Sequence, residues 1–499
     1  MLIVLATINA RYAHASLGLR YLQANMGELR DQTCIAEFSL SAGTAEIVER
    51  LLAHSPRIVG FGVYVWNVVE TTRVVEMLKR VAPEVRIVLG GPEVSYETAD
   101  QTIVQLADHV ITGWGELTLP QLCKQLLDDD RQGQPPKILA GVQVPLETLE
   151  LPYALYTDAD IAHRTLYVEA SRGCPFKCEF CLSALDKTAW PFNLEKFLGE
   201  LENLHARGAR RFKFVDRTFN LQVGSGLRIL RFLLEKNAAN PDNPDDPVFA
   251  HFETVPDYLP EVLKEIIGRF PSGTLQFEIG IQTWNPEVQN LISRRQDNAK
   301  AAGNLRWLRE SSQVHLHADL IFGLPGEDLP SFGRGFDRLV ALGPHEIQVG
   351  MLKRLRGAPI IRHSASHGLI FDPAPPYRIL ATNCVDFQTM QRMRRFARYW
   401  DLVANSGRFS NTAPVLLGDQ PFANFLAFSD WLYAKTNSTH RIALDRLAGL
   451  VGQWLQSRGL SEGRIKSLLT SDYAGQPLRK RSVDGISPSL PQRQAQHLA

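Results

Sequence analysis

Short apolar runs alternate with amphipathic helical segments along most of this chain, and the alternation occurs in two consecutive series. In the first series, apolar runs begin at Leu2, Arg57 and Arg86, and the segment from Val68 to Pro83 has helical spacing. Continuous apolar strands joined by helices are typical of a parallel sheet that is covered on both faces. The series predicts an α/β domain over residues 1–135, followed by a charged, proline-containing linker over residues 136–162.

The second series begins near Arg164 and contains six strand-like runs separated by helical patterns. In chain order these runs are TLYVEAS, RRFKFVD, VFAHFETV, LQFEIGIQ, VHLHADLIFGL and HEIQVGML. Six strand–helix units in a row are fewer than the eight that close a complete barrel. We therefore expect a partial (βα)6 barrel over residues 163–372.

The strand signal fades after Pro373, where long helical patterns follow. We expect a helical C-terminal domain over residues 373–474. The last segment, residues 475–499, is polar and contains prolines with little to bury, so we expect it to be disordered. Several domains agree with a length of 499 residues, which is too long for one ordinary core.

The composition excludes several classes of partner. The formal net charge is +1, which gives no electrostatic argument for a nucleic acid or an anionic membrane as a general partner. No apolar run reaches the roughly 18 residues of a membrane span, and we expect the apolar N-terminus to be a strand and not a signal peptide. Six scattered cysteines argue against a disulfide framework, so we expect a cytoplasmic protein in a reducing compartment.

Three of these cysteines, Cys174, Cys178 and Cys181, form a C-x3-C-x2-C pattern directly after the first strand of the second series. Three thiolates are one ligand short of a structural zinc site or of a fully protein-ligated iron–sulfur cluster. A zinc site would need a fourth ligand such as His163 or His205, and neither stands at a usual zinc-finger spacing. The other reading is a [4Fe-4S] cluster with one iron left open, which can chelate a small molecule.

The pattern resembles the signature of the radical S-adenosylmethionine (SAM) superfamily, including an aromatic residue, Phe180, before the third cysteine. The resemblance implies a [4Fe-4S] cluster on the three cysteines with SAM bound at the open iron. One-electron cleavage of SAM would give a 5′-deoxyadenosyl radical that abstracts hydrogen from an unactivated C–H bond. An external electron donor such as flavodoxin or ferredoxin is implied as well, and the protein would position the reactive atoms and exclude water.

Polar side chains stand at the ends of the second to fifth strands of the expected barrel. Carboxylates and an amide at such ends are well placed to bind the SAM ammonium group and ribose hydroxyls. The alternative for each residue is that it caps the following helix or pairs across the barrel. By resemblance, the predicted SAM-binding residues are Phe180, Asp216, Glu253, Glu278, Gln282 and Asp319.

The segments VGFGVYVWN, VLGGPEVS and ITGWGELT resemble the Rossmann-like cobalamin-binding domain found ahead of radical SAM barrels. Glycines at strand ends leave space for a bulky nucleotide tail. The D-x-H-x-x-G motif that ligates cobalt in cobalamin mutases is absent, and Asp108 and His109 do not fit it. His14 is either a cobalamin contact or, as is commoner for loop histidines, an unliganded polar residue. The predicted cobalamin-binding residues are Gly90, Gly91, Gly113, Gly115, Glu116 and Tyr64.

The remaining cysteines, Cys34, Cys123 and Cys384, lie far apart, and we expect them to be buried thiols. Methylthiotransferases of transfer RNA use three N-terminal cysteines for a second cluster. Only two cysteines of this chain lie near the N-terminus, so the sequence argues against an enzyme of that class.

The C-terminal region resembles that of a cobalamin-binding radical SAM subgroup whose helical domain has no assigned function. Its segment QRMRRFARYW places Arg392, Arg395 and Trp400 near one another at helical spacing. Such residues either grip an anionic or planar substrate or form a solvated helix face, which is the commoner outcome for a charge run.

Together these resemblances predict a cobalamin-dependent radical SAM enzyme, a methyltransferase that methylates an unactivated carbon of a small-molecule substrate. Cobalamin would deliver the methyl group and a second SAM would restore it. Two alternatives stay open: radical chemistry without methyl transfer, such as ring formation or oxidation, and a cobalamin- or redox-sensing binding protein. The sequence identifies neither the substrate nor the catalytic residues.

Overall fold

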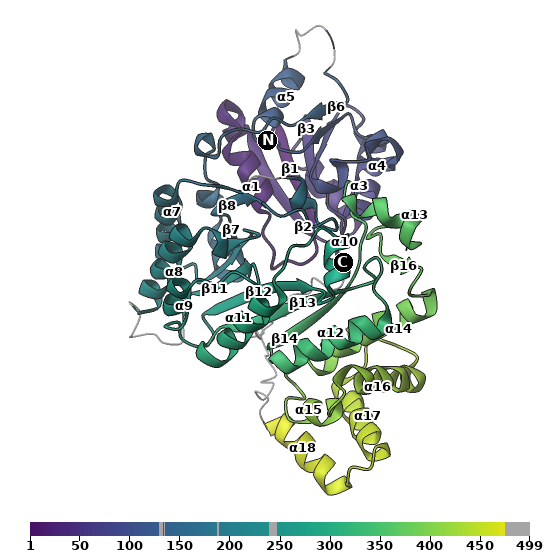
Figure 1. Ribbon diagram of the computed structural model, residues 1–499. Helices are drawn as coiled ribbons and strands as arrows, with labels where there is room; N and C mark the ends of the chain where they lie inside the picture. Colours follow the sequence, from purple (N-terminus) through teal and green to yellow (C-terminus); the bar gives the residue numbers. More distant parts are fainter. Residues whose placement is uncertain (129–132, 134, 187–188, 239–246, 475–499) are drawn as a thin grey trace.

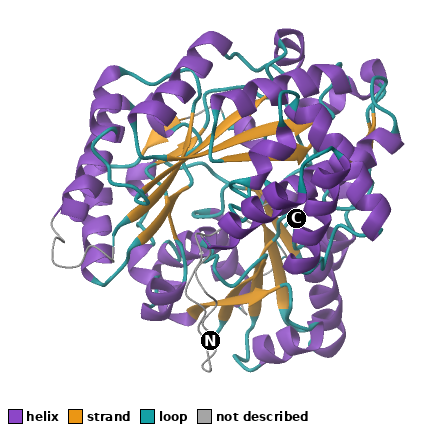
Figure 2. Ribbon diagram, turned by 90° about the horizontal axis from the view of Figure 1, so that it is seen from below, coloured by secondary structure: helices purple, strands orange, loops and turns teal. Residues whose placement is uncertain are grey.

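The computed structural model describes residues 1–128, 133, 135–186, 189–238 and 247–474 (Figure 1). It contains two large parallel sheets, with a helical region after the second (Figures 1 and 2). The expected tail, residues 475–499, lies outside the described residues. No helix in the described ranges is long and apolar enough to cross a membrane.

The first sheet has the order β2-β1-β3-β4-β5-β6, and all its paired strands run parallel. Its strands are β1 (Ile3–Asn9), β2 (Thr33–Ser39), β3 (Ile58–Gly62), β4 (Arg86–Gly90), β5 (His109–Thr112) and β6 (Ile138–Ala140). Its helices are α1 (Leu17–Ala24), α2 (Thr44–Leu52), α3 (Val68–Val81), α4 (Thr102–Leu106) and α5 (Thr118–Leu127). One buried cluster joins the sheet to α2, α3 and α4, and another joins it to α1 and α5, so both faces are covered as predicted.

The second sheet has the order β14-β13-β12-β11-β10-β7 and is also parallel throughout. Its strands are β7 (Leu166–Val168), β10 (Arg211–Phe214), β11 (Phe249–Thr254), β12 (Leu275–Gln282), β13 (His315–Phe322) and β14 (Glu346–Met351). Its main helices are α7 (Leu194–Ala206), α8 (Val223–Ala238), α9 (Glu261–Ile267), α11 (Asn298–Ser311) and α12 (Leu329–Leu342). The predicted six-stranded partial barrel is confirmed, because the six strands lie in chain order and no strand closes the circle within the described residues.

Strand β12 shows how the sequence forms an apolar outer face and a polar interior. Along it, buried Leu275, Phe277, Ile279 and Ile281 alternate with less buried residues, two of which are Glu278 and Gln282. Successive side chains of a strand point to opposite faces, so the apolar set packs under the helices. The polar set is therefore directed into the barrel.

The helical region packs against the last barrel strand and the barrel helix α12. Its elements are α14 (Phe387–Val403), α15 (Thr412–Leu417), α16 (Pro421–Thr436), α17 (Leu444–Ser457) and α18 (Glu462–Ala474), preceded by a short hairpin of β15 (Ile370–Phe371) and β16 (Ile379–Ala381). Phe336 of α12 lies edge-on to Phe396 and Trp400 of α14, with ring centroids 5.2 and 4.8 Å apart. The region thus shares one continuous apolar core with the barrel.

Ion pairs join loops at the carboxyl edge of the first sheet to segments that follow barrel strands. Glu116, after β5, lies 2.7 Å from Arg172, after β7. Glu97, after β4, lies 2.7 Å from Arg354, after β14. His14, after β1, hydrogen-bonds to the hydroxyl of Tyr167 on β7. The carboxyl edges of the two sheets therefore face each other, and in such α/β sheets these are the edges that bind ligands.

Candidate active site

The three cysteines of the C-x3-C-x2-C pattern lie on one loop at the facing carboxyl edges. β8 (Ser171–Gly173) pairs with β9 (Ala189–Pro191) and closes this loop at its base. Burial raises the pKa of the Cys174 thiol, and the neighbouring thiols of Cys181 and Cys178 raise it further. The loop therefore brings three thiols close enough to interact electrostatically.

Glu179, between the second and third cysteines, fixes the loop against two distant segments. Its backbone N–H donates to Ile292 (3.1 Å), and its carbonyl accepts from the N–H of Ile360 (2.9 Å). Its buried carboxylate accepts from Ser293 Oγ (2.6 Å) and bonds to the His363 ring (2.8 Å). A negative side chain thus holds the loop without lying among its thiols.

Two guanidinium groups lie beside the thiols. Nη1 of Arg294 is 3.7 Å from Cys178 Sγ, and its other terminal nitrogen donates to the carbonyl of Gly280. Cys181 is among the groups that raise the pKa of Arg217, although Glu253 raises it most. Positive charge beside a cysteine favours the thiolate, which is the form that binds iron.

The donor set fits a four-iron cluster better than a single metal ion. Across the described part of the chain, no three His, Cys, Asp or Glu side chains converge to hold one ion. Cys174, Cys178 and Cys181 instead interact electrostatically with one another, and Arg294 and Arg217 lie beside them. Thiolates are the usual protein ligands of iron–sulfur clusters.

Gln282 at the end of β12 is strained and has an unpaired acceptor. Its φ is +67°, in the left-handed region, and the strand pairing shifts register at this point. Its buried side-chain oxygen has no hydrogen-bond partner within the described structure. Strained residues and unpaired buried polar atoms mark functional positions, and this oxygen can accept from an ammonium or a ribose hydroxyl. The predicted SAM contact Gln282 therefore fits this ligand in hydrogen-bond type, because its unpaired oxygen is an acceptor and the ammonium and ribose hydroxyl groups of SAM can donate.

Asp319 lies on the neighbouring strand β13 and lines the same cavity as Gln282 and Phe180. His317 Nε2 lies 3.1 Å from its carboxylate. Burial raises the pKa of Asp319 to about 6, against the lowering effect of His317. A cationic ligand beside this carboxylate would favour its charged form.

The other predicted SAM-binding carboxylates have partners in the protein. Glu253 accepts two hydrogen bonds from Arg217, at 2.8 and 2.9 Å. Glu278 lies 3.1 Å from His251 inside the barrel and interacts with Lys213. Of the predicted set, the cavity at the carboxyl edge therefore brings together Phe180, Gln282 and Asp319.

Asp216, the remaining predicted SAM contact, is buried behind the cysteine loop. Its carboxylate accepts from the backbone N–H of Ala170 (3.0 Å) and the hydroxyl of Ser171 (2.6 Å). Burial raises the pKa of Asp216 to about 7. These contacts tie the end of β10 to the chain that enters the cysteine loop.

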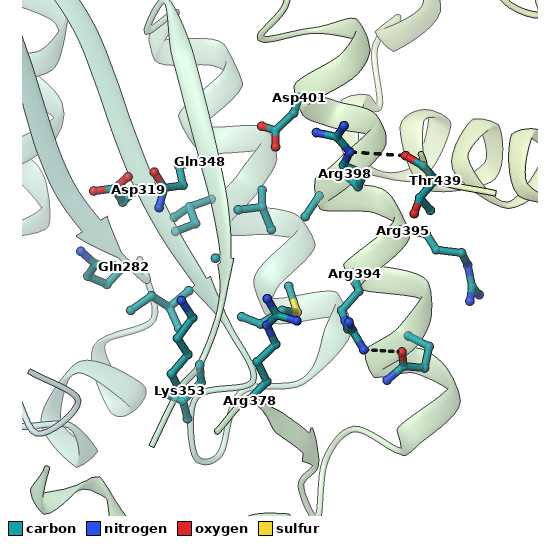
Figure 3. A pocket seen from close by; sticks show the side chains of 18 of the residues that line it. Gln282, Asp319, Gln348, Lys353, Arg378, Arg394, Arg395, Arg398, Asp401 and Thr439 are labelled. Carbon is teal, nitrogen blue, oxygen red and sulfur yellow. Dashed lines mark hydrogen bonds between the residues drawn. The ribbon is translucent and has the colours of Figure 1, made fainter. Parts of the chain in front are cut away.

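The cavity has a volume of about 580 Å³ and lies between the barrel strands and α14. Figure 3 shows Gln282, Asp319 and Gln348 on its barrel side and Arg394, Arg398 and Asp401 on its helical side. Lys353 and Arg378 line it as well. Sequence reasoning missed these two and Arg394, since they come from three separate segments with no shared motif.

On the first sheet, the predicted glycines differ in what they do. Gly91 has a φ of +106°, and a Cβ there would stand 2.5 Å from the carbonyl oxygen of Val63, so close backbone approach requires glycine. Gly113 also has a positive φ (+78°), but a Cβ would meet nothing within 4 Å. A Cβ on Gly90 would lie 3.9 Å from the carbonyl oxygen of Ile111, and a Cβ on Gly115 would meet the Leu22 side chain at 2.9 Å.

Tyr64 and Glu116, the other predicted cobalamin contacts, lie on different loops at the same edge. The ring of Tyr64 stacks on that of Trp66, with centroids 4.3 Å apart. Trp66 Nε1 is buried and has no hydrogen-bond partner within the described structure, so it can donate to a ligand such as a corrin amide. Glu116 is instead held by Arg172, which also contacts the ring of Trp114 at 4.6 Å.

Two further expectations need correction, one about the isolated cysteines and one about the cluster of Arg392, Arg395 and Trp400. Cys384 is exposed and Cys34 is only partly buried; of the three isolated cysteines only Cys123 is a buried thiol. Arg392 pairs with Asp430 (2.6 Å), and Trp400 is buried in the aromatic core, so neither lines the cavity, whereas Arg395 does. Helical spacing places these residues on one helix but does not decide which face meets the cavity.

Three family matches cover most of the chain in the expected order. Residues 3–123 match the B12 binding domain, residues 168–334 match the radical SAM superfamily, and residues 365–495 match a protein family of unknown function, DUF4080.

Among curated proteins, the chain is similar to two methyltransferases. It is 25% identical over 341 residues to 2-(S-pantetheinyl)-carbapenam-3-carboxylate methyltransferase of Streptantibioticus cattleyicolor, covering 61% of this chain and 48% of the relative. It is 24% identical over 343 residues to the cobalamin-dependent radical SAM methyltransferase TokK of Streptomyces tokunonensis, with the same coverage of 61% and 48%. The chain thus spans about half the length of the curated relatives it matches.

Two solved structures share the fold. The methyltransferase TsrM from Kitasatospora setae, solved with tryptophan substrate and a SAM analogue, superposes with a TM-score of 0.58 at 17% identity, covering 76% of this chain and 80% of TsrM. The cobalamin-dependent enzyme OxsB gives a TM-score of 0.60 at 13% identity, covering 95% of this chain and 83% of OxsB.

Fold, cysteine loop and family matches define a radical SAM protein with an N-terminal B12-binding domain. The chain belongs to the group of these proteins that also carries the DUF4080 region. The cofactors that these domains imply are a [4Fe-4S] cluster, SAM and cobalamin. The three thiols, the unpaired Gln282 oxygen and the unpaired Trp66 N–H fit these groups in donor and acceptor type.

Proposed function

We propose that this protein is a cobalamin-dependent radical SAM methyltransferase that methylates an unactivated carbon of a small-molecule substrate. The observation that carries the proposal is the 2.7 Å ion pair between Glu116 and Arg172. It ties the loop after β5 of the B12-binding domain to a residue two positions before Cys174. The loop proposed to hold the methyl carrier therefore lies beside the loop proposed to hold the cluster.

When bound, the cluster and cobalamin would supply one-electron cleavage of SAM and carriage of the methyl group. Cys174, Cys178 and Cys181 would hold the cluster, and the guanidinium of Arg294 would offset negative charge at Cys178. Gln282 and Asp319 would bind the ammonium or ribose of SAM at the end of the barrel. Burial of these groups between two sheet edges would keep water from the radical.

The stoichiometry of the proposed reaction follows from its balance. One substrate and two SAM molecules, with two electrons from a donor of the flavodoxin or ferredoxin class, give methylated substrate, 5′-deoxyadenosine, methionine and S-adenosylhomocysteine. Hydrogen moves from the substrate carbon to the 5′-deoxyadenosyl group, and a methyl group replaces it.

Anaerobic reconstitution with iron, sulfide and cobalamin tests the proposal. We expect a four-iron absorbance band, and, with SAM and a reductant, both 5′-deoxyadenosine and S-adenosylhomocysteine. A variant with all three cysteines changed to alanine should lose the band and the 5′-deoxyadenosine, while Cys123→Ala, a buried thiol far from the loop, should keep both. Formation of 5′-deoxyadenosine without S-adenosylhomocysteine would contradict methyl transfer. Absence of both products would contradict the proposal that the protein is a radical SAM enzyme.

A further inference from the structure

The cavity beside the SAM-binding residues is strongly cationic. Five basic side chains line it, against two acidic ones, Asp319 and Asp401. The basic residues are Lys353, Arg378, Arg394, Arg395 and Arg398. The whole chain has a formal charge of only +1, so this concentration is local.

Two of these basic side chains are occupied by groups of the C-terminal domain. Arg398 Nε donates to the carbonyl of Thr439 (3.3 Å), as Figure 3 shows. Arg395 lies over the ring of Tyr433, with its guanidinium carbon 4.4 Å from the ring centroid. These contacts stabilise the cavity wall. The three other basic residues of the lining are Lys353, Arg378 and Arg394.

Arg378 and Arg394 have no carboxylate within ion-pair distance among the residues that the structure describes. Arg394 Nη1 donates to Gln391, a neutral amide, at 2.9 Å. By contrast, Arg392 on the same helix pairs with Asp430 outside the cavity. On α14, the charge of Arg392 is therefore neutralised by a carboxylate of the helical region, whereas the charge of Arg394, which lines the cavity, is not.

The charge of Arg378 is repelled by that of Lys353 and by that of Arg394. Lys353 and Arg378 are backbone neighbours in an antiparallel bridge. Burial and, to a smaller extent, the charge of Arg378 together lower the pKa of Lys353 to about 8. Burial and the charge of Arg394 likewise lower the pKa of Arg378, against the smaller raising effect of Asp372. An anion among the three would remove this mutual destabilisation.

We propose that Lys353, Arg378 and Arg394 bind an oxyanion group, a carboxylate or a phosphate, on the substrate. Guanidinium groups pair with either oxyanion through two parallel hydrogen bonds, and an ammonium adds a point charge. The identification of this anion as part of the substrate rests on the proposed function, because it requires SAM at the Gln282 and Asp319 end. The anion would then fix which carbon of the substrate faces the SAM-derived radical.

Calorimetric titration of the full chain, without SAM, tests the site. Inorganic phosphate and succinate serve as the two probes, at low ionic strength because exposed charges are screened by salt. We expect at least one probe to bind, and Arg378→Gln and Arg394→Gln each to weaken it by about tenfold. The matched control Arg392→Gln, on the same helix but paired with Asp430, should bind as the parent does.

Binding of phosphate alone assigns a phosphate, and binding of succinate alone assigns a carboxylate. Absence of binding at millimolar probe, or equal affinity in the Arg378→Gln and Arg394→Gln variants, would overturn the proposal. Arg394 is exposed, so its variant should fold even if Arg378→Gln does not, and circular dichroism checks both. Since the titration involves no SAM cleavage, its failure is separate from failure to form 5′-deoxyadenosine.

Discussion

Replacing Glu179 by alanine should release the cysteine loop from the barrel. This carboxylate is 3% exposed and bonds to Ser293 at 2.6 Å and His363 at 2.8 Å. Removing this carboxylate leaves the Ser293 hydroxyl and the His363 ring without it, and each buried polar group left unsatisfied costs about 1–3 kcal/mol. Arg362 also contacts Glu179, but its side chain is 62% exposed and adds little.

The expected loss therefore comes from two buried groups and amounts to about 2–6 kcal/mol for Glu179→Ala. Glu179→Gln keeps the size of the side chain and an acceptor for Ser293, so it should cost only about 1–2 kcal/mol. The ordering of the two variants follows from charge and hydrogen bonding, since both retain the backbone contacts of Glu179 to Ile292 and Ile360.

Thermal unfolding of the metal-free protein, followed by circular dichroism, measures this effect. At about 2–4 °C per kcal/mol for domains of this size, Glu179→Ala should lower the midpoint by at least about 4 °C. After anaerobic reconstitution, it should also hold less iron per chain than the parent. Lys177→Ala, an exposed change in the same loop, is the control and should alter neither.

A midpoint within about 2 °C of the parent for Glu179→Ala, with full iron content, would refute the reasoning. That result would mean that the loop keeps its conformation through its backbone hydrogen bonds alone.

Three other substitutions test separate parts of the structure. Gly91→Ala should destabilise the protein by more than about 2 kcal/mol in urea, and Gly113→Ala by about 1 kcal/mol, because only the first combines positive φ with a 2.5 Å contact; equal losses would contradict this. Gln282→Leu should weaken SAM binding in equilibrium dialysis by about tenfold without lowering the unfolding midpoint, since its oxygen has no partner to lose. Asp216 has a folded pKa of about 7, above its unfolded value, so its contribution is largest at low pH and is lost as the pH rises to about 7. As the pH rises from 5 to 8, the free energy of unfolding of Asp216→Asn should therefore increase relative to that of the parent. A difference between the two proteins that does not change with pH would contradict the raised pKa of Asp216.

The fold could be predicted largely because buried parallel strands leave a strong apolar signal. β3, β4, β12 and β13 each contain runs of buried Val, Ile, Leu or Phe, and each was expected from its sequence. The edge strand β2, TCIAEFS, in which only Thr33 and Phe38 are fully buried, is not predicted from the sequence. An edge strand is stabilised by one neighbour and needs less apolar sequence. The domain limits remain predictions.

Part of the candidate site could likewise be predicted from the sequence and part could not. Cys174, Cys178 and Cys181 form a local motif, so their proximity follows from spacing. Gln282 and Asp319 follow from the rule that the ends of parallel strands meet at one edge. The positive wall of the cavity does not follow, because Lys353, Arg378 and Arg394 become neighbours only when α14 packs on β14.

The contribution of α14 to the cavity has an evolutionary consequence. One wall holds Gln282 and Asp319 on barrel strands, and the opposite wall comes from a different domain. New specificity can therefore arise by change in the C-terminal helical region while the half with the cysteine loop stays as it is. Relatives with this barrel but another C-terminal region would then act on substrates of different charge. Comparison of the helices that face β14 in such relatives would group the proteins by the charge of their substrates.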